Sequence, residues 1–152
     1  MRHTGTWNGN PLLSSAGVAA CTLYKDGEPQ RKAREMGTYL REQGNKILKD
    51  KKISGHLYGR TIIHLYFGPF DFEPDNEYSP PTKDVQKIMN KEMATVKTLL
   101  GLHLLHRGIA TMGGRFFVLS AVHTKQDIEQ TMEAFDLALD GLVAEGGVPK
   151  AD

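Results

Sequence analysis

Two short segments rich in β-branched and aromatic residues constrain the fold of this chain most strongly. They span residues 53–58 and 61–67 and are separated only by Gly59 and Arg60. Such residues are enriched in strands, and a two-residue connection that contains Gly is typical of a β-hairpin. The pattern therefore predicts two strands and favours their antiparallel pairing.

Helical patterns precede these strands. Asn10 followed by Pro11 is a typical helix start, because Asn caps free N–H groups and Pro fits the first helical position. The helix is expected to end near residue 26, and its small and apolar residues predict packing on several sides. A second, amphipathic helix is expected from Pro29 to about Lys49.

The second half of the chain predicts further regular structure. Residues 68–81 are too rich in proline for a helix or strand, and apolar residues at helical spacing then predict one helix over residues 82–107. Two short strands are expected at residues 109–112 and 116–120, on either side of a Gly-rich turn.

A last helix is predicted after Thr124, which lies three residues before Asp127 in the pattern of a capping box. The resulting order pairs strands with their sequence neighbours and separates them from the helices. This order indicates an α+β fold and not a doubly wound sheet. With 152 residues the chain is long enough for one domain with one core.

Charge and composition disfavour several classes of partner. Lys and Arg number 19 against 18 for Asp and Glu, so the net charge of +1 gives no strong field for nucleic acid or anionic lipid. No apolar stretch approaches the roughly 18 residues of a membrane span, and the first residues lack the apolar region of a signal peptide. The single cysteine, Cys21, cannot form an internal disulfide, which is compatible with the cytoplasm.

A loop rich in Gly, Thr and Asn extends from His3 to Pro11. Gly5 lets backbone N–H groups approach a phosphate closely, and the hydroxyl of Thr6 adds a further donor. The same residues also suit a plain loop that leads into a helix cap. Local chemistry leaves both interpretations open.

Two motifs at opposite ends of the chain resemble one family. The segment Gly5-Thr6-Trp7-Asn8-Gly9-Asn10-Pro11 resembles the G-T-x-x-G/A-N-P segment of class III aminotransferases. The segment Ser120-Ala121-Val122-His123-Thr124-Lys125-Gln126-Asp127-Ile128 resembles the S-x-x-H-T-x-x-D-I ending of glutamate-1-semialdehyde aminomutases and their relatives. Because the element order between the motifs also matches, the resemblance covers nearly the whole chain, as the C-terminal portion of that family.

The resemblance implies the small C-terminal domain of a fold type I enzyme that depends on pyridoxal 5'-phosphate (PLP). Such a domain has a short, mostly antiparallel sheet covered by helices, and an interface loop and a long connecting helix precede it. On this basis residues 1–27 form the cofactor loop and connecting helix, 28–148 the small domain and 149–152 a tail. The full-length enzymes are homodimers, and the chain is expected in the cytoplasm.

In that family the loop reaches across the dimer interface to the phosphate of the neighbouring subunit's PLP. By position, the resemblance assigns this contact to Thr6, with Gly5 beside it. It also implies transfer of an amino group of an amino-acid or amino-aldehyde substrate through aldimine and quinonoid states, with PLP as electron sink.

The family's Schiff-base lysine, by contrast, belongs to sequence that precedes the Gly-Thr loop. Lys25 and Lys46 lie on predicted polar surfaces, where a solvated lysine stays protonated and reacts poorly with carbonyl groups. We therefore expect that the chain alone catalyses nothing and is either a fragment or a shortened reading frame. The alternative is a stand-alone, non-catalytic α+β module for binding or oligomerisation.

Two arginines are weaker candidates for substrate contact. Arg115 follows two glycines near the position where relatives carry a substrate-facing glutamate or a carboxylate-binding arginine, and its fork suits a carboxylate. Arg60 lies between the predicted strands, where the family usually has a small or apolar residue. A surface ion pair is the alternative for both. His103 and His106 have metal-ligand spacing, but no nearby residue completes a set, so no metal site is predicted.

Overall fold

The computed structural model of the chain describes residues 5–74 and 77–149. Within these residues, five helices and three strands follow in the order α1, α2, β1, β2, α3, α4, β3, α5. The three strands form one antiparallel sheet in the order β1-β2-β3. The α+β class predicted from the sequence is therefore confirmed.

The predicted hairpin is confirmed as β1 (Gly55–Gly59) and β2 (Ile62–Phe67), which pair antiparallel. The third strand, β3 (Phe116–Val118), pairs with the other edge of β2. Because side chains alternate along a strand, one face of the sheet carries the fully or almost fully buried residues. These are Leu57, Ile63, Leu65, Phe67 and Phe117.

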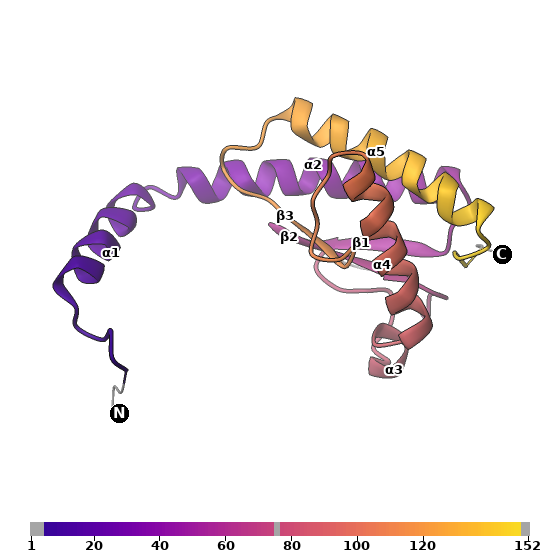
Figure 1. Cartoon of the computed structure of the whole chain (residues 1–152), viewed down its shortest axis with the longest axis horizontal. Coiled ribbons are helices and arrows are strands. Elements are labelled where there is room, and N and C mark those ends of the chain that lie inside the picture. Colours follow the sequence, from indigo (N-terminus) through magenta and orange to yellow (C-terminus); the bar gives the residue numbers. More distant parts are fainter. Residues whose placement is uncertain (1–4, 75–76, 150–152) are drawn as a thin grey trace.

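Helices α2 (Glu28–Asp50) and α5 (Lys125–Ala144) run side by side over this buried face, as Figure 1 shows. Two glycines allow α2 to lie close to the hairpin. A Cβ atom added at Gly37 would lie 1.8 Å from the carbonyl oxygen of Arg60, and one at Gly44 would lie 2.0 Å from Leu57 Cδ1. Only a residue without a side chain fits at these distances.

The outer edge of β1 is occupied by side chains of α2. The Asn45 side chain accepts a hydrogen bond from the Leu57 N–H at 2.7 Å and donates one to the Leu57 carbonyl at 3.0 Å. The Gly59 carbonyl accepts from Arg41 at 2.8 Å, and the Gly59 N–H donates to the carbonyl of Glu77 at 2.7 Å. The backbone groups that point outward at Leu57 and Gly59 are thus all paired.

Two elements in the second half differ from the prediction. The single helix expected over residues 82–107 is wrong, because α3 (Val85–Ile88) and α4 (Lys91–His106) are separate helices. The side chain of Asn90 accepts hydrogen bonds from the N–H groups of Glu92 and Met93, and so starts a new helix there.

The strand expected over residues 109–112 is also wrong. The chain turns there, since Gly113 and Gly114 adopt positive φ angles of 63° and 67° and the Gly114 N–H donates to the Thr111 hydroxyl. Only Phe116–Val118 of the strand expected over residues 116–120 pairs with the sheet.

Helix α1 (Pro11–Leu23) begins as predicted, with the Asn10 side chain accepting from the N–H groups of Leu12 and Leu13. It extends away from the sheet (Figure 1), and none of its residues is buried by the described part of the chain. Leu12 is 78% exposed and Leu23 is 73% exposed. The packing on several sides that its composition predicts is therefore absent among the described residues.

Candidate functional site

The loop that carries Gly5 and Thr6 forms two overlapping turns before α1. The Asn8 N–H donates to the Gly5 carbonyl at 3.1 Å, and the Asn10 N–H donates to the Trp7 carbonyl at 3.2 Å. Thr6 is exposed, and neither its hydroxyl nor its N–H is hydrogen-bonded to the described residues. His3, at the start of the predicted loop, lies outside those residues.

These free donors suit a phosphate, which accepts hydrogen bonds from backbone N–H and hydroxyl groups. The loop lies at the far end of α1, away from the sheet (Figure 1), and the described residues provide no wall around it. The loop of Gly5 and Thr6 therefore fits the phosphate group of PLP. The pyridine ring of PLP would have to be enclosed by other protein surfaces.

The structure does not bring the candidate arginines to this loop. Arg60 lies in the connection of the hairpin, with its guanidinium carbon 4.2 Å from the centroid of the Tyr78 ring. Arg115 immediately precedes β3 and donates from Nε to the Met112 carbonyl at 3.3 Å. Both are exposed, at the sheet and not at the loop of Thr6.

An ion pair between a buried arginine and a partly exposed glutamate connects the proline-rich segment to the domain. Arg41 is 6% exposed and contacts the carboxylate of Glu77 as well as the Gly59 carbonyl. A hydrogen bond from Tyr78 and the charge of Arg41 hold the pKa of Glu77 below its usual value. This pair was not predicted from the sequence, although Arg41 follows Gly37 by four residues and thus shares its buried helix face.

The same segment is held at its other end by Asp71. Its carboxylate accepts from the Thr82 hydroxyl and contacts Lys87, and these two partners lower the pKa of Asp71. The Tyr66 hydroxyl donates to the Pro69 carbonyl at 2.9 Å. The described residues on both sides of positions 75 and 76 are therefore anchored to the domain by side-chain contacts.

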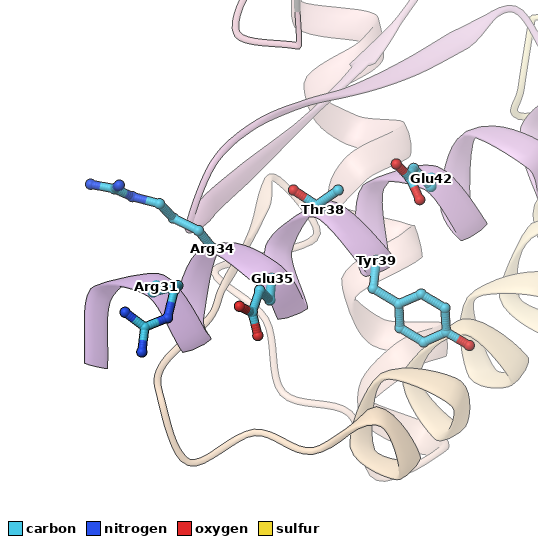
Figure 2. Close-up of a pocket in the computed structure, with 6 residues that line it drawn as sticks. All are labelled: Arg31, Arg34, Glu35, Thr38, Tyr39 and Glu42. Carbon is cyan, nitrogen blue, oxygen red and sulfur yellow. The ribbon is translucent and has the colours of Figure 1, made fainter. Parts of the chain in front are cut away.

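A shallow hollow of about 400 Å³ lies beside α2. Figure 2 shows Tyr39 pointing toward α5, where its hydroxyl donates to Glu129 at 3.1 Å, while Arg31 and Arg34 point away from it. The lining residues are Arg31, Arg34, Glu35, Thr38, Tyr39 and Glu42. Their charges are mixed and do not converge on one point, so this hollow is not a candidate active site.

Among the described residues, no group of three or more His, Cys, Asp or Glu side chains is placed to hold a metal ion. His103 instead lies 3.2 Å from the carboxylate of Glu145. Each helix in the described part of the chain is too short or too polar to cross a membrane.

No family model matches the chain. It is similar to glutamate-1-semialdehyde 2,1-aminomutases. That of Methanothrix thermoacetophila is 29% identical over 142 residues, which cover 91% of this chain and 30% of the relative. That of Methanopyrus kandleri is 28% identical over 143 residues, which cover 92% of this chain and 31% of the relative. The chain thus spans about 30% of the length of these relatives.

Solved transaminases share the fold. A β-phenylalanine aminotransferase from Variovorax paradoxus superposes with a TM-score of 0.78 at 24% identity, over 100% of this chain and 33% of its own. The chain has the fold of the C-terminal part of a class III transaminase. A transaminase with PLP bound shares this class III transaminase fold with a TM-score of 0.72 at 19% identity, over 96% and 31% of the two chains.

The resemblance to class III transaminases predicted from the two motifs is therefore confirmed, including its restriction to the C-terminal portion. The roles assigned to Gly5, Thr6, Arg60 and Arg115 stay predictions. The division of this transaminase-like chain at residues 27 and 148 also stays a prediction.

Proposed function

We propose that this chain serves as the C-terminal segment of a PLP-dependent aminotransferase or aminomutase. The observation that carries the proposal is the extent of the match. More than nine tenths of the chain is similar to about 30% of the length of aminomutases, and the same portion of solved transaminases has its fold. The proposed enzyme acts in the cytoplasm as a homodimer.

In this proposal Gly5 and Thr6 contact the phosphate of PLP bound mainly by other parts of the enzyme. PLP, when bound, supplies an electron sink for chemistry at the amino-bearing carbon of the substrate. The Thr6 hydroxyl and nearby N–H groups hold the phosphate and so keep the cofactor in position. Their exposure at the tip of a protruding helix supports a contact made outside this domain.

The substrate is an amino acid or an amino aldehyde. Arg115 is free of carboxylate partners among the described residues, so its guanidinium is available for a substrate carboxylate. Arg60 is the weaker candidate because it already stacks on Tyr78. The small domain would close the substrate pocket.

The chain by itself is proposed to be inactive. Lys25 and Lys46 are both exposed, and a solvated ammonium group is a poor imine-forming nucleophile. The test is to add PLP to the purified chain and record its visible absorption. We expect only the spectrum of free PLP; a shifted band that borohydride abolishes would show a lysine-bound cofactor and contradict the claim of inactivity.

The in-frame coding sequence that precedes residue 1 tests the larger proposal. A Ser-x-x-Lys or Ser-Lys motif in that sequence, followed directly by this chain, is the expected result. Expression of one protein that contains both the preceding sequence and this chain should then give PLP-dependent amino-group transfer. A joined protein that folds and retains the lysine motif yet binds no PLP would overturn the proposal and favour a binding or oligomerisation module.

A further inference from the structure

The loop before α1 contains an asparagine followed directly by a glycine. These residues are Asn8 and Gly9, and both are exposed. The side-chain carbonyl carbon of an asparagine lies at the right separation along the chain to form a five-membered ring with the next backbone nitrogen. This reaction makes asparagine one of the thermolabile residues of proteins. A following glycine favours it most, because no Cβ atom shields the glycine nitrogen.

The backbone holds this pair in an open turn. The Asn10 N–H donates to the Trp7 carbonyl at 3.2 Å, so Asn8 and Gly9 are the two central residues of the turn. Gly9 has a φ angle of 74°, and a Cβ atom added to it would meet no described atom within 4 Å. Gly9 is therefore not shielded by any other described part of the chain.

Neither of the two groups that would react is held by a hydrogen bond. The Asn8 carboxamide lies beside Gly5, since a Cβ atom added at Gly5 would be 3.1 Å from its oxygen and its nitrogen. This carboxamide makes no hydrogen bond with the described residues, and the Gly9 N–H donates to none of them. Ring closure at Asn8 thus requires no hydrogen bond to these residues to be broken first.

The other asparagines that the structure describes lack this combination. Asn10 precedes Pro11, whose nitrogen carries no hydrogen and cannot attack in the same way. The side chain of Asn45 is fixed by two hydrogen bonds to the backbone of β1. The side chain of Asn90 is fixed as the cap of α4. The free carboxamide and the following glycine occur together at Asn8.

We propose that Asn8 is a site of spontaneous deamidation. The deprotonated Gly9 nitrogen attacks the Asn8 side-chain carbonyl carbon, so a new C–N bond forms. The bond from this carbon to the side-chain nitrogen breaks, and ammonia leaves after taking a proton from water. Water then opens the cyclic imide at one of its two carbonyl groups and leaves aspartate or isoaspartate. Water is the only co-reactant, and nothing is oxidised or reduced.

The reaction changes the charge of the loop. A carboxylate replaces a neutral carboxamide, which lowers the net charge of the chain from +1 to zero. The new charge lies two residues after Thr6, whose hydroxyl and N–H are free donors. A carboxylate there repels a phosphate. The loss of phosphate affinity rests on the proposed function, whereas the modification itself does not.

The experiment incubates the full chain at mildly alkaline pH and follows the mass of its peptides. Asn8 should gain about 1 Da, because –OH replaces –NH2, and ion exchange should separate a more acidic form. Asn45 and Asn90 are internal controls in the same sample and should keep their mass. Asn8→Gln should abolish the mass gain, since its longer side chain would have to form a larger ring.

Two further measurements test the mechanism and the role of the loop. The rate at Asn8 should rise roughly tenfold per pH unit between about pH 7 and pH 9, because the attacking species is the deprotonated nitrogen. The folded chain and the chain unfolded in urea should convert Asn8 at comparable rates. Asn45, in contrast, should convert faster in urea than in the folded chain, because its two hydrogen bonds are lost on unfolding.

Several results would overturn the proposal. An unchanged mass at Asn8 after the unfolded chain has converted would mean that the folded loop protects this residue. Equal conversion of Asn8 and Asn45 in the folded chain would remove the selectivity. The same acidic form in Asn8→Gln would place the reaction at another residue. None of these readouts involves PLP, so a failure here is distinct from a failure of the proposed function.

Discussion

Gly37 determines how closely α2 can approach the hairpin. Because a Cβ atom there would lie 1.8 Å from the Arg60 carbonyl oxygen, which is backbone and cannot rotate away, Gly37→Ala should force the two elements apart. We expect a loss of about 1–3 kcal/mol in the free energy of unfolding, measured with urea. Gly17→Ala, whose Cβ would contact no described residue within 4 Å, is the control. An unchanged unfolding midpoint in Gly37→Ala would mean that the close approach is absent in solution.

His56 predicts a pH dependence of stability. Burial, and secondarily the charge of Arg41, lowers its pKa in the folded chain below the ordinary value of 6.5. As the pH falls through about 6.5, the unfolded chain therefore takes up the proton first, and stability decreases with decreasing pH. His56→Gln should reduce the change in the urea midpoint between about pH 7 and pH 5.5, leaving the part due to His64, whose pKa burial also lowers, while the exposed His106→Gln should leave the change as it is. A parent chain that is equally stable at both pH values would refute the shift.

Prediction from the sequence was uneven at the level of single residues. Asn10 and Thr124 cap helices as expected, because a cap depends only on the next three or four residues. Arg41 was missed, because whether a charged side chain on a helix is buried depends on elements far away in sequence. Arg41 is enclosed only after residues 59 and 77 fold against α2.

At the scale of an element, the capping box of α5 gives a quantitative test. The Thr124 hydroxyl accepts from the Asp127 N–H, and the Asp127 carboxylate accepts from the Thr124 N–H. Thr124→Ala should lower the free energy of unfolding by about 1 kcal/mol, by the usual cost of an N-cap. Thr98→Ala, an exposed threonine on α4, should change it far less. Equal effects at both positions would show that the cap does not stabilise α5.

The elements predicted correctly and incorrectly differ in the range of the interactions that define them. The hairpin and the last helix follow from local patterns, namely a two-residue connection and a capping box. A single helix was expected over residues 82–107 because apolar residues keep a helical spacing on both sides of Asn90. The Asn90 side chain instead caps the start of a second helix. The strand expected over residues 109–112 failed since the Gly113-Gly114 turn leaves the chain packed on α4.

At the scale of the whole molecule, α1 is structurally separate from the domain. Deletion of residues 1–26 should change the free energy of unfolding of the remainder by less than about 0.5 kcal/mol, because α1 buries none of its residues on the described chain. Light scattering should show that the shortened chain is more monodisperse, since the exposed apolar residues of α1 are gone. A clearly lower unfolding midpoint would mean that α1 packs on the domain.

The closed outer edge of β1 limits how this molecule can aggregate. Asn45 occupies both outward-pointing groups of Leu57. Arg41 and the Glu77 carbonyl occupy those of Gly59, so a strand from another copy finds few partners there. The opposite edge is β3, only three residues long. Self-association driven by α1 should accordingly give amorphous or micelle-like clusters that dissolve on dilution, without the cross-β fibrils that an open sheet edge would seed.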